Sequence, residues 1–254
     1  MKIKACVIFY NDGPELLRAC LESLRNQVDQ ILCIDGAYKD FPHKEPYSTD
    51  GCLQIAKELA DEVIECSTPW ENQIVKRNAY LTASKSFKGY LLIIDADEMI
   101  QGSFPNAGSC PEYSIELKAE AYTLNQIRLI KNRKGLEYRD KHCFLYDNER
   151  LINQSEFNPE ARQLKDLCIL HNFHLRSPER LHTDGEYLRN RIEAERPAVF
   201  PKLENLVNLQ YIGTSPYSGF DGSNTLTAFS GQAVKVSPEK AEQLLSDFPT
   251  DWRK

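Results

Sequence analysis

The sequence predicts an α/β fold in which helices flank a mostly parallel β-sheet that continues into an antiparallel extension. Apolar runs without polar alternation, such as Ala5–Tyr10 and Tyr90–Ile94, are typical of strands that are covered on both faces. An apolar stripe with helical spacing follows the first run, at Leu17, Cys20, Leu21 and Leu24. Later, residues 113–121 alternate apolar and polar side chains, which indicates a half-exposed antiparallel strand.

The predicted elements alternate in the first half and become strand-rich in the second. Strands are predicted at 5–10, 31–34, 61–65 and 90–94, and helices from 14, from 50 to 60 and from 71 to 86. Further strands are predicted at 113–121, 142–146 and 167–175, with a hairpin whose turn lies at 132–135. A charged helix from 177, a loop or lid at 211–231 and a helix at 237–248 complete the chain.

Composition excludes several function classes. The 254 residues are 41% hydrophobic and carry a net charge of −6, which argues against a nucleic-acid partner. No apolar run approaches the roughly 20 residues of a membrane span, and no secretory signal precedes the first strand, so we expect a cytoplasmic protein. The eight cysteines form no Cys-x-x-Cys pair, and we interpret them as reduced core thiols rather than zinc ligands.

Three carboxylates follow the strand at Tyr90–Ile94. In an extended segment Asp95 and Asp97 would point to the same side, where their charges need a cation. A divalent ion that bridges to phosphate oxygens meets this need. Because ligands bind at the carboxyl ends of parallel strands, Asp35 is expected beside the first turn, Tyr10–Asp12, at the same edge of the sheet as Asp95. The alternative is that Asp95 and Asp97 only end a strand and cap the next element.

Two further polar features lie inside apolar patterns. Arg77 lies on the inward stripe of its predicted helix, so we expect it to face an anion or carbonyl rather than solvent. His171 and His174 lie on the predicted strand at 167–175, on opposite faces because they are three residues apart. One of the two, with a slight preference for His171, is therefore a candidate metal ligand, and the other is structural.

Several motifs together resemble family 2 glycosyltransferases of the GT-A fold. Their order and spacing agree over about residues 3–100, and the later segments 138–142 and 169–180 also resemble members with Asp-x-Asp-Glu. The matching pieces are Ile8–Asp12, Asp35–Gly36, Ser48–Gly51, Lys76–Asn78 and Asp95–Glu98.

This resemblance implies a GT-A-like domain with two halves. Residues 1–110 would bind the nucleotide sugar, and residues 111–254 would form the acceptor side of one continuous domain. Asp97 would hold a divalent metal, Mn²⁺ or Mg²⁺, on the donor diphosphate. The implied donor-binding residues are Phe9, Tyr10, Asn11, Asp12, Asp35, Lys76, Arg77 and Asp95.

The implied reaction is inverting transfer of a sugar from a nucleoside-diphosphate sugar to the hydroxyl of a glycan or other acceptor. The sequence departs from the family pattern at an insertion over residues 37–47 and at Cys143, where related members often carry Glu. The usual catalytic base is thus missing, and Asp140, Asp184 and Glu186 are unranked substitutes. The alternatives are a non-catalytic sugar-nucleotide or glycan-binding module and a nucleotidyltransferase, although the first turn lacks the Gly-rich basic loop of the latter.

Overall fold

The structure is a computed structural model of the 254-residue chain. It forms two compact units, residues 1–189 and 190–254, which are described separately. The described residues are 1–105, 108, 110–120, 122–139, 143–153, 158, 161–177, 180–185, 187, 207–211, 217–221, 224–228, 233–236, 238–248 and 252–253.

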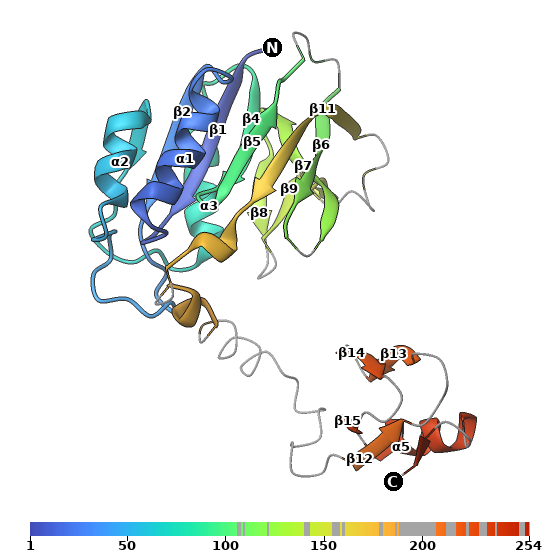
Figure 1. The fold of residues 1–254 in the computed structure, drawn as a ribbon. Helices are drawn as coiled ribbons and strands as arrows, with labels where there is room; N and C mark the ends of the chain where they lie inside the picture. The colour runs from blue at the N-terminus through green and yellow to red at the C-terminus, as the bar shows by residue number, and fades with distance from the viewer. Residues whose placement is uncertain are drawn as a thin grey trace. The chain divides into compact units, whose positions relative to one another are not determined.

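Four parallel strands form the first part of an eight-stranded sheet, in the order β3-β2-β1-β4 (Figure 1). Strands β1, β2 and β4 are buried along nearly their whole length, which is why sequence alone locates them, whereas β3 is short and partly exposed. Helices α1 and α2 pack on one face of the sheet and α3 on the other. The bounds are β1 Ile3–Phe9, α1 Pro14–Arg25, β2 Gln30–Asp35, α2 Cys52–Leu59, β3 Glu62–Ile64, α3 Gln73–Ala83 and β4 Tyr90–Asp95.

The same sheet continues through β7-β6-β11-β5, and three of these four junctions from β4 onward are antiparallel. The α/β fold with a mostly parallel half and an antiparallel extension is therefore confirmed. Strand β11 ends beside the start of β5, so its last residues reach the edge at which β4 ends. The bounds are β5 Glu98–Gly102, β6 Glu112–Lys118, β7 Thr123–Lys131 and β11 Arg162–His171.

The predicted hairpin around 132–135 is wrong. Strand β8 (Leu136–Arg139) pairs with β9 (Phe144–Asp147), which also pairs with β10 (Arg150–Leu151) in a separate three-stranded sheet, whereas β7 stays in the large sheet. Asn78 of α3 explains the separation, because its side chain donates to Tyr138 O at 3.0 Å and accepts from Tyr138 N at 2.8 Å. The small sheet therefore packs against α3.

In its described residues, the second unit contains a three-stranded sheet, a hairpin and one helix. Its apolar core consists of Leu209, Val236, Ala241, Leu244 and Trp252. The predicted C-terminal helix is confirmed, but the predicted loop at 211–231 contains two paired strands, β13 and β14. The bounds are β12 Val207–Tyr211, β13 Tyr217–Asp221, β14 Asn224–Ala228, β15 Ala233–Val236, α5 Pro238–Asp247 and β16 Trp252–Arg253.

The boundary between the compact units lies after Arg189, whereas the predicted boundary between donor and acceptor halves lies after residue 110. The division into donor and acceptor halves concerns function and stays a prediction. Within the part of the chain that the structure describes, no helix is long and apolar enough to cross a bilayer.

Candidate active site

The turn after β1 is fixed by the segment that follows the 37–47 insertion. Asn11 adopts a left-handed backbone with φ 47°, and its side-chain oxygen accepts from Thr49 N at 2.8 Å. Ser48 Oγ accepts from Asn11 N at 3.0 Å. The Asn11 side chain is thus used to shape the turn.

Asp35 ends β2 and is completely buried. Its carboxylate accepts from Ser48 N at 3.0 Å and from Ser48 Oγ at 2.6 Å. Burial raises the pKa of Asp35 although the bonds to Ser48 act in the opposite direction. The insertion therefore leaves Asp35 and Ser48 in direct contact, as a short connection would.

Gly36 follows at φ 118°, and a Cβ there would meet Cys66 Sγ at 2.1 Å, so this position requires glycine. Trp70 Nε1 donates to Asp35 O at 2.7 Å and closes the same turn from the other side.

Lys76 and Phe9 lie beneath this turn rather than in it. Phe9 is 2% exposed and packs in the main core, so its side chain does not face a ligand. Lys76 is 1% exposed, and its Nζ donates to Phe9 O at 2.7 Å and Gly36 O at 2.6 Å. Burial lowers the pKa of Lys76 to about 7. Lys76 therefore links the ends of β1 and β2 by hydrogen bonds. Direct contact of Phe9 or Lys76 with a sugar-nucleotide donor stays a prediction.

Arg77 is turned inward, as its place on the apolar stripe predicts. It is 8% exposed, and its Nη2 donates to Asp95 Oδ1 at 2.9 Å. Burial alone would raise the pKa of Asp95, but Arg77 and Arg128 hold it below its usual value. The partner within the chain is thus a carboxylate at the end of β4.

Glu98 holds the backbone of Asp95 in place by a hydrogen bond. Its Oε2 accepts from Asp95 N at 2.8 Å, and its Oε1 accepts from Arg128 Nη2 at 2.6 Å. Burial raises the pKa of Glu98 to about 7. The third carboxylate of the motif therefore anchors the turn between β4 and β5.

Asp97 lies in that turn, so the expectation that Asp95 and Asp97 share one face of an extended segment is wrong. The chain reverses at Ala96–Asp97, and Asp97 points toward β11 instead of α3. His171 Nε2 and Arg176 Nη2 each lie 3.2 Å from Asp97 Oδ2. The nearby Asp97 carboxylate raises the pKa of His171. Neither contact has hydrogen-bond geometry, which leaves this buried oxygen without a hydrogen bond.

The two histidines do not share one strand. β11 ends at His171, and His174 lies in a 3₁₀ turn, Phe173–Leu175, with an exposed side chain. Asn172 N donates to Asp97 O at 2.8 Å, which ends the strand at this point. The structure thus brings His171, and not His174, beside Asp97, while its role as a ligand stays a prediction.

Arg176 and Arg180 complete the cluster, and the sequence analysis did not single them out. Arg176 Nη2 lies 3.0 Å from Asp12 Oδ1, and its Nη1 donates to Asp184 Oδ2 at 2.7 Å. Arg180 Nη1 donates to Tyr10 O at 2.6 Å, and its Nε lies 3.1 Å from Asp184 Oδ1. The i, i+4 spacing of 176, 180 and 184 was the available signal.

Asp184 is the one base candidate that the structure describes, and its two oxygens are held by these arginines. Asp140 and Glu186 lie outside the described residues.

Aromatic side chains from the insertion cover the first turn. Phe41 is 5% exposed and packs edge-on against Tyr10, with ring centroids 5.9 Å apart. The Arg180 guanidinium lies over the Phe41 ring, at 4.6 Å from the ring centroid. Phe41 therefore packs the insertion onto the first turn.

The carboxylates and the imidazole of this cluster are candidate ligands of a divalent metal. Asp12 Oδ1 and Asp97 Oδ2 are buried without hydrogen bonds, and carboxylate oxygen and imidazole suit Mn²⁺ or Mg²⁺. Arg176 is the cation that now lies between the two carboxylates. In the described part of the chain, no three His, Cys, Asp or Glu residues are grouped to hold an ion. The residues thus fit a metal only if substrate phosphates supply the remaining ligands.

Comparison with known proteins identifies the N-terminal part. Residues 5–104 match the model of the family "Glycosyl transferase family 2", which confirms the resemblance and the glycosyltransferase class for this segment. No curated protein matches the chain at a significant level.

Solved structures with similar folds include S. aureus TarS 1-349 in complex with UDP-GlcNAc, at 23% identity and a TM-score of 0.31 over 40% of this chain and 28% of that one. TarS 1-349 alone gives 16% identity and a TM-score of 0.40, over 81% of this chain and 77% of that one. A mannosyltransferase, PcManGT from Pyrobaculum calidifontis in complex with GDP-Man and Mn²⁺, gives 14% identity and a TM-score of 0.44, over 79% of this chain and 66% of that one. The chain thus spans less than two thirds of two of these three structures.

Proposed function

Because residues 5–104 carry the segment that defines glycosyl transferase family 2, we propose that this protein transfers a sugar from a nucleoside-diphosphate sugar to an acceptor hydroxyl, with inversion. One observation carries the proposal: carboxylates and arginines from α3, the end of β4, the turns after β1 and β4, and the segment after β11 meet at one edge of the sheet. Two of the carboxylate oxygens there are buried without hydrogen bonds. Such a site is arranged for cations and phosphates.

The nucleoside side of the donor belongs, in this proposal, to the first turn and Asp35. Support comes from Ser48, which holds the Asp35 carboxylate and the Asn11 backbone at once. A turn fixed in this way loses little conformational freedom when a ligand binds. Asp95, oriented by Arg77, would approach the ribose from the neighbouring strand.

Asp97 and His171 would hold a divalent ion, Mn²⁺ or Mg²⁺, together with phosphate oxygens of the donor. When bound, the ion supplies positive charge that stabilises the departing diphosphate. Arg77 and Arg176 add fixed positive charge at the same edge, where the leaving group gains negative charge.

The acceptor hydroxyl must lose a proton to a base on the opposite face of the sugar. Asp184 can serve only after an ion pair with Arg176 or Arg180 opens, because both of its oxygens are taken. Asp140 and Glu186 stay candidates for this role. The glycan acceptor and the cytoplasmic location also stay predictions.

The test is release of nucleoside diphosphate from a panel of UDP- and GDP-sugars, with and without Mn²⁺. We expect at least one donor to turn over, and the double variant Asp95→Asn/Asp97→Asn to lose this activity. Asp166→Asn is the control, since Asp166 is an exposed carboxylate on the same strand as His171. Donor binding without turnover, for every donor and acceptor mixture, would contradict the proposal.

A further inference from the structure

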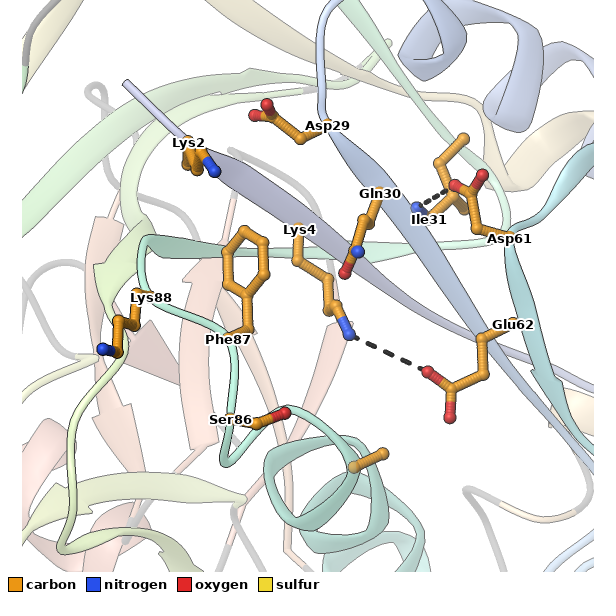
Figure 2. A pocket seen from close by; sticks show the side chains of 11 residues that line it. Lys2, Lys4, Asp29, Gln30, Ile31, Asp61, Glu62, Ser86, Phe87 and Lys88 are labelled. Carbon is orange, nitrogen blue, oxygen red and sulfur yellow. Dashed lines mark hydrogen bonds and ion pairs between the residues drawn. The ribbon is translucent and has the colours of Figure 1, made fainter.

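Two hollows flank the loop between α3 and β4, at the amino end of β4. The smaller has a volume of about 560 Å³, and Figure 2 shows that both lysine and carboxylate side chains line it. Three lysines there (Lys2, Lys4 and Lys88) match three carboxylates (Asp29, Asp61 and Glu62). Lys4 Nζ lies 3.8 Å from Glu62 Oε2, the ion pair drawn as a dashed line in Figure 2. This hollow is electrically balanced.

The larger hollow, called the basic groove below, has a volume of about 1120 Å³. Six cationic residues against two acidic ones give it a formal charge of +4, in a chain whose net charge is −6. Its charged lining is Lys85, Lys88, Lys131, Arg133, Lys134, Arg139, Glu137 and Glu149.

The two arginines of the basic groove are already neutralised. Arg133 pairs with Glu112 and Asp147, and Arg139 pairs with Glu137 and Glu149. None of the four lysines has an ion pair with a residue that the structure describes. The excess charge therefore consists of the exposed ammonium groups of Lys85, Lys131 and Lys134, together with that of Lys88, which also lines the smaller hollow. Ammonium groups bind phosphates as point charges.

The frame that carries these lysines is held by hydrogen bonds. Asn132 Nδ2 donates to Ser84 O at 2.6 Å and to Phe87 O at 2.8 Å, which links the β7 end to the α3–β4 loop. Asn148 N donates to Gly135 O at 2.9 Å, which links the two turns of the small sheet. The groove thus exists before a ligand arrives, and only the lysine stems need ordering.

The basic groove is distinct from the candidate active site. It touches Tyr90, the first residue of β4, whereas Asp95 is the last. Tyr90 and Asp95 are five residue steps apart along the strand, which corresponds to roughly 17 Å. A donor diphosphate at Asp95 and Asp97 therefore does not reach it.

We propose that the basic groove is a second anion site, for a ligand that carries two or more phosphate groups. Four ammonium charges can neutralise two phosphate dianions, and the hollow shape suits a discrete ligand. A bilayer with phosphate headgroups offers the same chemistry, but its flat surface would leave the hollow unfilled. A soluble oligophosphate is therefore the appropriate probe.

The experiment uses the full chain without metal, with inorganic tripolyphosphate as the probe and lysine acetylation, followed by mass spectrometry, as the readout. We expect tripolyphosphate to slow acetylation of Lys85, Lys131 and Lys134 several-fold while Lys2, in the balanced hollow, reacts at an unchanged rate. Lys131→Gln/Lys134→Gln should weaken binding roughly tenfold by calorimetry, and Lys2→Gln should not change it. Melting curves establish that both variants are folded.

Three results would overturn the proposal. Equal protection of Lys2 would mean diffuse charge attraction, and unchanged affinity of the double variant would place the anion elsewhere. Binding to phosphatidate vesicles without any binding of tripolyphosphate would make the surface a membrane contact instead. Because the acetylated lysines and the substituted residues lie outside the donor edge, the outcome is independent of the proposed glycosyl transfer.

Discussion

Asp97 has an oxygen that is buried without a hydrogen bond, a costly condition for a carboxylate unless a cation is close. We predict that Asp97→Asn abolishes the rise in melting temperature produced by Mn²⁺ plus donor and lowers activity by roughly 100-fold or more. Differential scanning fluorimetry and nucleotide-release assays measure both. An unchanged metal-dependent shift would exclude Asp97 as a ligand, with Asp166→Asn as the reference variant.

Arg176 supplies the cation that Asp12 and Asp97 contact in the metal-free chain. Arg176→Gln should therefore tighten Mn²⁺ binding in the presence of nucleoside diphosphate about tenfold, because the ion no longer competes with a guanidinium. The same change should lower the metal-free free energy of unfolding by about 2–4 kcal/mol, since it leaves buried carboxylates unpaired. Calorimetric Mn²⁺ titration and urea unfolding measure the two effects. Weaker Mn²⁺ binding would show that Arg176 assists the ion.

Lys76 gives a prediction about pH. Its pKa is lowered to about 7 by burial, below the value of an unfolded lysine near 10.4. Between these values the unfolded chain binds more protons, so the contribution of Lys76 to stability increases from pH 7 to pH 10 and is lost as pH falls toward 7. The stability difference between the parent and Lys76→Met should therefore rise by roughly 1 kcal/mol per pH unit over this range. A pH-independent difference, measured by urea unfolding, would contradict it.

At the scale of elements, the parallel half could be predicted from sequence because its central strands are apolar on both faces, as in Tyr90–Ile94. The pairing of β8 could not, since it pairs with the following strand β9 rather than with the preceding strand β7, and Asn78 of α3 holds it through hydrogen bonds to Tyr138. In the site, Arg77 could be predicted because its helical stripe is apolar. The contact of Arg176 with Asp12 could not, because the i, i+4 spacing of 176, 180 and 184 indicates only local ion pairs, and Asp12 is far away in the sequence.

The insertion at 37–47 is the element with the most specific consequence for binding. Phe41→Ala should remove the packing of this segment on Tyr10 and the stacking on Arg180. We predict a loss of about 3 kcal/mol in the free energy of unfolding and weaker donor binding, since both contacts hold the first turn. Tyr47→Ala is the control, because Tyr47 is 41% exposed. Equal effects of the two variants would mean that the segment contributes no defined packing.

At the scale of the whole molecule, every described residue of the candidate active site lies in the unit formed by residues 1–189. We predict that a fragment of residues 1–189 folds and binds nucleoside diphosphate and Mn²⁺ with the affinity of the full chain. Calorimetry on both proteins measures this. A folded fragment that fails to bind would mean that the second unit contributes to the donor site.

The direct bond between Asp35 and Ser48 has a consequence for the length of the segment between them. Once these two residues are joined, the intervening chain is a closed loop, and its closure entropy grows only with the logarithm of its length. Doubling the loop would cost about 0.6 kcal/mol. The exposed residues 42–45 can therefore be extended at little thermodynamic cost while Asp35 keeps its position and Phe41 keeps its packing, so this part of the loop is a place where ligand preference can change and the scaffold need not.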